Sequence, residues 1–296
     1  MIVIMEQIII YLTLIIFGLC LGSFAGASMW RFRAQQLNQD KKDGEDFDKV
    51  EYKRLFKLTK PSLLNDHSQC LNCSYSLKWY DLVPVFSWLS LGGKCRKCRK
   101  PIGYLEPLIE VGLALFFVLS YTFWPYGIST SIGLARLILW LVSGVGLAIL
   151  FAYDMKWSLL PDKVSFSVIG IGVCNALLVI FSSPDKVAAF FSVIGSIFIL
   201  SGIYWIIYII SRGMWIGFGD IKLGLGLGLL LADWKLAFVA LFAANLIGCL
   251  IVIPPIVFGK LKRDSHIPFG PLLIIGFIIA GLAGNYLLSV YFYSLV

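Results

Sequence analysis

The chain has 296 residues, of which 59% are hydrophobic and only 14% are charged. Soluble globular domains carry about 25% charged residues, so this composition excludes an ordinary soluble protein. The formal net charge of +8 is not interpreted as a nucleic-acid signal, because basic residues gather on the cytoplasmic side of membrane proteins. We therefore expect a polytopic membrane protein of the all-α class that contacts lipid and has no nucleic-acid partner.

Apolar stretches close to the roughly 20 residues that cross a bilayer recur along the chain. The first stretch lacks the basic n-region of a signal peptide and is too long for one, so we expect a retained helix. The sixth is short and rich in glycine, which predicts a partial or tilted span. In all, about eight transmembrane helices are predicted, near residues 7–30, 105–124, 132–153, 164–182, 187–210, 220–232, 235–258 and 270–293.

Lysine and arginine are unevenly distributed over the connections between these segments. Of the 25 basic residues, 22 fall in connections on one side, and only Arg136, Lys186 and Lys235 fall on the other. The basic side is expected in the cytoplasm, with both termini outside. The same alternation predicts that Asp154 and Asp220, which flank the third and sixth segments, lie together at the cytoplasmic side.

The chain is predicted to have three parts: a first helix over 1–30, a cytoplasmic loop over 31–104, and a membrane core of about seven helices over 105–296. Within the loop, residues 34–66 are charged and of mixed sign. They predict a mobile arm with a short surface helix, or a solvated linker. Residues 67–103 carry four of the seven cysteines.

Cys70 and Cys73 form one Cys-x-x-Cys pair, and Cys95 and Cys98 form a second. This spacing is typical of four-thiolate zinc sites, in which each pair supplies two tetrahedral corners. Disulfides are the weaker alternative in a reducing cytoplasm. Four thiolates leave no open coordination position, so we expect a structural zinc and no catalytic metal. The aromatic run 79–88 is either part of this module or a patch at the membrane interface.

Two aspartates stand at the edges of apolar segments, where a carboxylate is costly to place. Asp154 closes the third segment, at the end of the helix dipole that disfavours negative charge. Asp220 follows Gly217 and Gly219, which allow close backbone approach, and precedes Lys222. Two facing carboxylates can share a proton and hydrolyse a peptide bond without metal. A helix N-cap is the structural alternative for Asp220.

These motifs, in this order, resemble the bacterial type IV prepilin peptidases, which are Gly-x-Gly-Asp membrane aspartic proteases. Asp154 to Asp162 matches the family's Asp-x(5)-Leu-Pro-Asp frame, and Gly217 to Lys222 matches its Gly-x-Gly-Asp-x-Lys. The four-cysteine loop, the stretches 83–89 and 92–95, and Ile267 to Pro271 match as well, so the resemblance covers nearly the whole chain.

The resemblance implies a membrane aspartic endopeptidase with Asp154 and Asp220 as its catalytic pair, supported by Gly217, Gly219 and Lys222. Its implied substrates are type IV prepilins or pseudopilins, whose short basic leader is removed at the cytoplasmic face of the bacterial inner membrane. Many such enzymes then N-methylate the new N-terminal residue with S-adenosylmethionine.

Glu110 and Arg31 are the residues that we associate with this methylation. The family's Asn in the first segment is Gly26 here, and its Arg-Tyr before the glutamate is replaced in Leu105-Glu106. Both glutamates share one helix face, which is expected to point into a polar cavity. They serve the methylation site or pair with Arg31 or Arg136.

An ion-coupled membrane transporter, or a scaffold with a structural zinc loop, is the alternative function. A transporter places its acidic residues near the membrane midplane. The charge distribution instead predicts Asp154 and Asp220 at the cytoplasmic edge, which favours the peptidase.

Overall fold

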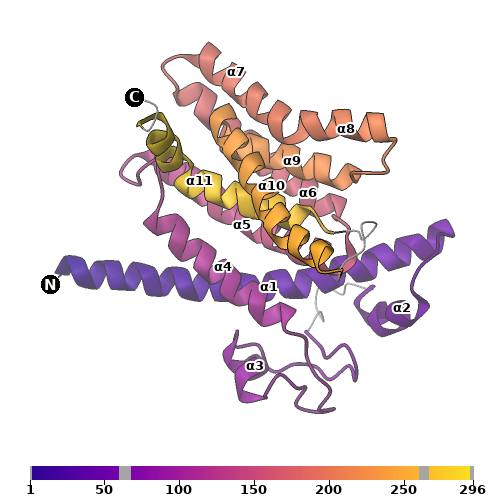
Figure 1. Ribbon diagram of the computed structural model, residues 1–296. Helices are drawn as coiled ribbons and strands as arrows, with labels where there is room; N and C mark the ends of the chain where they lie inside the picture. The colour runs from indigo at the N-terminus through magenta and orange to yellow at the C-terminus, as the bar shows by residue number, and fades with distance from the viewer. Residues whose placement is uncertain (1, 60–67, 260–266, 294–296) are drawn as a thin grey trace. The chain divides into compact units, whose positions relative to one another are not determined.

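The computed structural model describes residues 2–59, 68–259 and 267–293, almost entirely as helices (Figure 1). Within these ranges, extended structure is confined to two isolated bridges, Gln69 with Ser76 and Lys94 with Pro101. Seven of the helices are long and apolar enough to cross a membrane. The all-α membrane class is therefore confirmed. The chain divides into two compact units, Met1–Val118 and Leu119–Val296.

The first unit contains the longest helix of the described chain and several short ones. Its elements are α1 (Ile2–Asp43), α2 (Lys49–Leu55), η1 (Phe56–Thr59), η2 (Trp79–Asp81), α3 (Phe86–Ser90) and the first part of α4 (Leu105–Thr122). Small residues bring α1 and α4 into close contact: a Cβ at Gly18 or Gly22 would lie 2.4 Å or 2.5 Å from the Cα of Ala114 or Glu110. Such close approach is typical of helix packing in membranes.

The polar extension of α1 is covered by α2 and η1. Ala34, Leu37 and Leu55 form a buried cluster between these elements. Arg33 pairs with Glu51 at 2.8 Å, which links α1 to α2 a second time. The predicted short helix is confirmed, but the prediction of a mobile arm or solvated linker is wrong for residues 34–59, because apolar residues continue along one face of α1. Residues 60–66 of that segment lie outside the described ranges.

The second unit is a bundle of helices. Its elements are α5 (Ser131–Trp157), α6 (Asp162–Ser182), α7 (Lys186–Ile197), the π-helical turn η3 (Phe198–Gly202), α8 (Ile203–Ser211), α9 (Phe218–Leu231), α10 (Trp234–Val257) and α11 (Gly270–Tyr293). The segment from α7 through α8 is one continuous span, Lys186–Ser211. Many large apolar side chains on these helices, such as Phe242 and Leu250 of α10, are exposed, as expected of a surface that faces lipid.

Helix α9 lies inside this bundle and is the predicted sixth segment. It has 14 residues, and at about 1.5 Å per residue it cannot cross a hydrocarbon core of about 30 Å. It contacts α6, η3, α7 and α11, and nearly all of its residues after Lys222 are buried. An apolar helix without a polar face belongs in such an interior position. All eight predicted segments are thus helical, and this one is the expected partial span.

The π-helical turn η3 is fitted closely to α9. A Cβ at Gly224 would clash with the carbonyl oxygen of Leu200, so the two backbones touch there. On either side of this contact, Ser196 Oγ donates to Gly228 O at 2.8 Å and Ser201 Oγ donates to Ile221 O at 2.9 Å. Because both bonds are buried, they fix the position of α9 along its own axis.

Candidate active site and metal centre

Asp154 lies near the C-terminal end of α5 and is 5% exposed. Its Oδ2 accepts a hydrogen bond of 3.0 Å from the backbone N–H of Gly270, the first residue of α11. The N-terminus of a helix carries partial positive charge, so α11 favours a negative charge on this carboxylate. This contact offsets the unfavourable position of Asp154 on its own helix.

Gly270 is the part of this site that sequence reasoning missed. A Cβ at position 270 would lie 2.7 Å from Asp154 Oδ2 and 3.5 Å from Leu223 of α9. Only a residue without a side chain therefore fits between α5 and α9. Gly270 lies in the stretch Ile267 to Pro271 that matches the family motif. The motif does not show which residue the glycine contacts.

Asp220 is the third residue of α9 and is partly buried. Its carboxylate interacts electrostatically with that of Asp154, so two acids from different helices are neighbours in the fold. The N-cap position of α9 is occupied by Gly217, so Asp220 itself is not the cap. The alternative prediction, that Asp220 is the N-cap of this helix, is therefore wrong.

The two motif glycines have different surroundings. A Cβ at Gly219 would lie 3.1 Å from the side chain of Leu160, so this glycine is needed for packing against the connection that follows α5. At Gly217 the nearest atoms are Asp220 Oδ2 at 3.5 Å and Gly219 N at 4.0 Å, both from its own loop. The backbone is thus open to its surroundings at Gly217 and closely packed at Gly219.

Lys222 has a defined partner on another helix. Its Nζ lies 2.5 Å from Oδ1 of Asp162, the first residue of α6. The ammonium group also lies over the rings of Phe166 and Phe218, at 5.5 Å and 5.0 Å from their centroids. Lys222 therefore connects α9 to α6 through its ion pair with Asp162.

A second group of buried acidic residues lies in the first unit, on α4. Glu110 is 7% exposed, and its Oε2 accepts a hydrogen bond of 2.7 Å from the backbone N–H of Val85. Glu106 Oε1 accepts from the indole N–H of Trp30 at 3.0 Å, and its Oε2 is buried without a hydrogen-bond partner among the described residues. Both glutamates thus contact other parts of the first unit, and the polar cavity expected around them stays a prediction. Arg31 follows Trp30 on α1 and is partly buried.

Val85 holds an unusual backbone conformation beside Glu110. Its φ of 60° and ψ of −50° are rare for a β-branched residue. The backbone N–H of Phe86 donates to Pro84 O at 2.5 Å, which closes a γ-turn around Val85. Strained backbone of this kind persists where the surrounding contacts impose it, and it is concentrated at functional sites.

The other predicted partner of the glutamates, Arg136, belongs to the second unit. Its guanidinium lies over the ring of Tyr126, 3.6 Å from the centroid, and its Nε donates to Asn175 Oδ1 at 3.3 Å. Asn175 in turn donates to the carbonyl oxygens of Leu229 and Leu230 at the end of α9. Arg136 therefore supports the C-terminus of α9.

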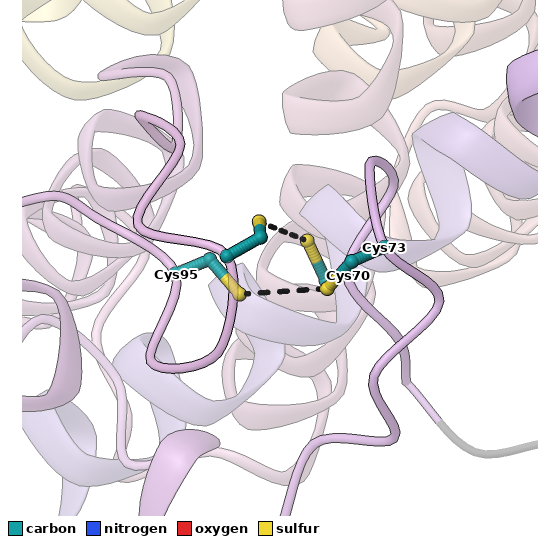
Figure 2. Close-up of side chains that lie close together, drawn as sticks. Cys70, Cys73 and Cys95 are labelled. Atoms are coloured by element: carbon teal, nitrogen blue, oxygen red, sulfur yellow. Dashed lines mark hydrogen bonds between the residues drawn. The ribbon is translucent and has the colours of Figure 1, made fainter.

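The four loop cysteines converge, as their spacing predicts (Figure 2). All four sulfur atoms lie within 4.8 Å of one another, with Cys70 to Cys98 and Cys73 to Cys95 both at 3.9 Å. In a tetrahedral zinc site with Zn–S bonds of about 2.3 Å, neighbouring sulfurs are about 3.8 Å apart. The donor set and its size therefore fit a four-coordinate ion of this kind.

The thiols of this cluster differ in acidity. Burial raises the pKa of the Cys70 thiol to about 11. Desolvation also opposes ionisation of Cys95, but hydrogen bonds from the backbone N–H groups of Cys98 and Lys97 outweigh it and lower the pKa of that thiol to about 7. A bound cation would favour the thiolate form of all four residues.

The two cysteine pairs are built by the same backbone pattern. In each turn, the backbone N–H four positions after the first cysteine donates to the carbonyl oxygen of that cysteine. Ser74 N donates to Cys70 O at 2.9 Å, and Arg99 N donates to Cys95 O at 3.0 Å. Ser74 and Arg99 both have positive φ, 55° and 57°. The module is therefore a pair of equivalent turns whose cysteine side chains face each other.

The aromatic run 79–88 is attached to the second turn. Asp81 is paired with Arg96 at 2.8 Å, and its side chain is only 2% exposed. Trp88 donates from its indole N–H to Gly103 O at 3.1 Å. The run therefore contacts the cysteine module but is not its core, because Trp79 and Phe86 are exposed, and the patch at the membrane interface stays a prediction.

Comparison with known proteins gives matches along most of the chain. Residues 16–124 match a family described as the bacterial peptidase A24 N-terminal domain, and residues 141–253 match the type IV leader peptidase family. The prepilin leader peptidase/N-methyltransferase of Pseudomonas aeruginosa is 27% identical over 94% of this chain and 91% of its own length.

Two further relatives agree with these matches. The protein of the same name from Burkholderia pseudomallei is 32% identical over 71% of this chain and 64% of its own length. The type 4 prepilin-like proteins leader peptide-processing enzyme of Escherichia coli is 29% identical over 93% of each chain. No solved structure matches the chain.

Proposed function

The chain belongs to the type IV leader peptidase family, and on that premise we propose that it removes the short basic leader of type IV prepilins or pseudopilins. Asp154 and Asp220 are the proposed catalytic pair. The observation that supports this most is the meeting of two carboxylates from α5 and α9, with the N-terminus of α11 directed at one of them. Two carboxylates that share a proton can hydrolyse a peptide bond without a metal ion.

We propose different starting roles for the two acids. The Gly270 N–H favours the charge on Asp154, so this residue begins as the base and Asp220 carries the shared proton. Asp154 takes a proton from water while the water oxygen bonds to the scissile carbonyl carbon, and Asp220 donates its proton to the carbonyl oxygen. The C–N bond of the tetrahedral intermediate then breaks as the proton held by Asp154 goes to the leaving amine, and one hydroxyl of the intermediate returns a proton to Asp220 as the carbonyl group re-forms.

The membrane orientation is proposed from charge. With most basic residues on one side, the positive-inside rule places the cysteine loop and both aspartates at the cytoplasmic face of a bacterial inner membrane, with the termini outside. This is the face at which a basic leader remains accessible. No observation favours the ion-coupled transporter or scaffold.

A second proposed activity is N-methylation of the new N-terminal residue with S-adenosylmethionine, at a site that includes Glu110 and Arg31. It is supported by the buried carboxylate of Glu110 on α4 and the strained turn beside it. Gly26, which replaces the family's Asn, leaves room there: a Cβ would meet only Glu106 Cγ at 3.9 Å and Ile109 at 4.0 Å. Glycine at this position in place of asparagine therefore leaves the space beside α4 open.

The four-cysteine cluster is proposed to bind structural zinc. The two turns supply all four ligands, so the ion would join residues 70–73 to residues 95–98 and fix the loop. We assign the ion this structural role and no part in peptide hydrolysis.

One experiment tests both activities. Purified full-length protein in detergent is incubated with a prepilin, and the products are identified by mass spectrometry with and without S-adenosylmethionine. We expect a cut that releases the leader, and an additional methyl mass on the mature N-terminus only with the cofactor. An uncut prepilin would contradict the peptidase proposal, and a cut but never methylated product would contradict the methyltransferase proposal alone.

A further inference from the structure

Tyr204, in the first turn of α8, has a buried hydroxyl group without a hydrogen-bond partner. The residue is 5% exposed, and no described residue forms a hydrogen bond with its hydroxyl group. A buried hydroxyl that makes no hydrogen bond is costly, and native structures rarely keep one without a role. The π-helical turn η3 directly precedes it, and such turns are frequent at functional sites.

The surroundings of Tyr204 belong to the aspartate site. Its ring packs edge-to-face on Phe269, with centroids 5.4 Å apart. Phe269 immediately precedes Gly270, whose N–H binds Asp154. The phenol also interacts electrostatically with Asp220. Tyr204 therefore lies beside the aspartate site, although the proposed reaction leaves its hydroxyl unused.

Asn245 is a second polar group near this hydroxyl. It lies at the centre of α10, is exposed, and interacts with Tyr204 without meeting hydrogen-bond geometry. Its amide donates to Leu241 O, within its own helix, at 2.8 Å. An amide that faces lipid in the middle of a span is unfavourable unless another polar group covers it. Helix α9, which carries Asp220, contacts both α8 and α10 (Figure 1).

We propose that Tyr204 and Asn245 together bind the backbone of the substrate beside the bond that is cut, on the side of its apolar helix. A peptide must be extended to be cleaved, so its N–H and C=O groups lose their helical partners at membrane depth and need others. The phenol can donate and accept, and the amide offers both kinds of group. This inference rests on the proposed peptidase function and adds the residues that position its substrate.

A photo-crosslinking experiment tests where the substrate lies. p-Benzoylphenylalanine is incorporated at position 245 of a full-length variant that carries Asp154→Asn and Asp220→Asn, so that bound prepilin is not consumed. The control is incorporation at Tyr286, which is 71% exposed on α11. We expect ultraviolet light to join position 245, but not position 286, to prepilin residues near the cleavage site. Crosslinking that is absent at 245, or equal at both positions, would overturn the proposal.

Kinetics give a second, independent test. Tyr204→Phe and Asn245→Leu should each lower kcat/KM for prepilin by roughly 3- to 10-fold, the loss expected for one hydrogen bond. The double variant should lose less than the product of the two, because both side chains bind one peptide. Tyr208→Phe, one turn further along α8, is the matched control and should change kcat/KM less than twofold.

The melting temperature separates substrate positioning from a purely structural role, which would lower stability and activity together. Under the proposal, Asn245→Leu removes an amide from a lipid-facing position, so the melting temperature of the variant should hold or rise while its activity falls. If the wild type cleaves prepilin and both variants match it, the substrate-positioning role is wrong and the peptidase proposal stands. If the wild type cleaves nothing, the peptidase proposal itself fails.

Discussion

The cysteine module and the aspartate site differ in how far apart along the chain their parts lie. The paired cysteines are separated by at most 28 positions, and each turn closes through its own backbone hydrogen bonds. The aspartate site instead joins α5, α9 and α11, and one of its hydrogen bonds spans 116 positions. The first site therefore depends on local turns and on the proposed metal, and the second depends on how a whole bundle packs.

This comparison predicts that small changes in packing disrupt the aspartate site most. Gly270→Ala would push a methyl group to 2.7 Å from Asp154 Oδ2. A misplacement of about 1 Å can cost about 100-fold in rate, so kcat for leader removal should fall by that order. Gly170→Ala is the control, because nothing lies within 4 Å of a Cβ there. A Gly270→Ala enzyme with wild-type kcat would show that the close fit is not required.

Loss of the metal should leave the aspartate chemistry in place. Cys70→Ser together with Cys95→Ser removes one ligand from each turn, and metal content should drop from about one zinc per chain to nearly none. Protease cuts should then appear within residues 68–103, while leader removal continues because its proposed mechanism uses no metal. Cys174→Ser, at an exposed cysteine of α6, is the control. Unchanged metal content in the double variant would contradict the four-cysteine site.

The smallest effect is expected at the strained turn positions of the module. Ser74→Gly and Arg99→Gly place glycine where φ is 55° and 57°, which relieves about 1 kcal/mol of backbone strain at each position. The module should hold zinc slightly longer against a chelator, as measured by the rate of metal release. Ser76→Gly, at a residue that forms a bridge with Gln69, serves as the control and should not slow release. Faster release from the two turn variants would contradict the assigned strain.

The sequence predicted the local features better than the assembled ones. The spacing of Cys70, Cys73, Cys95 and Cys98 was enough to predict their convergence, because each turn is formed by neighbouring residues. Apolar length likewise predicted the helices, including the short sixth one. The packing of α2 on α1 was not predicted, because the many charged residues of this segment obscure the apolar face to which Ala34 and Leu37 belong.

The support around the aspartates could not be predicted from spacing. The charge distribution placed Asp154 and Asp220 together, but the partner of Gly270 depends on where α11 begins in three dimensions. The same holds for Lys222, whose partner Asp162 lies on α6, and for Tyr204, which looks like any aromatic residue in an apolar segment. Only the packed bundle shows that its hydroxyl is left without a partner.

The most direct test of the catalytic pair is the rate of leader removal by Asp154→Asn and Asp220→Asn, measured with full-length protein in detergent. Loss of a central catalytic group costs roughly 10⁴-fold or more, so each variant should fall at least that far while it keeps its metal and its melting temperature. Asp233→Asn keeps the cap of α10 and should cleave at the wild-type rate. Wild-type cleavage by either Asp154→Asn or Asp220→Asn would contradict the account.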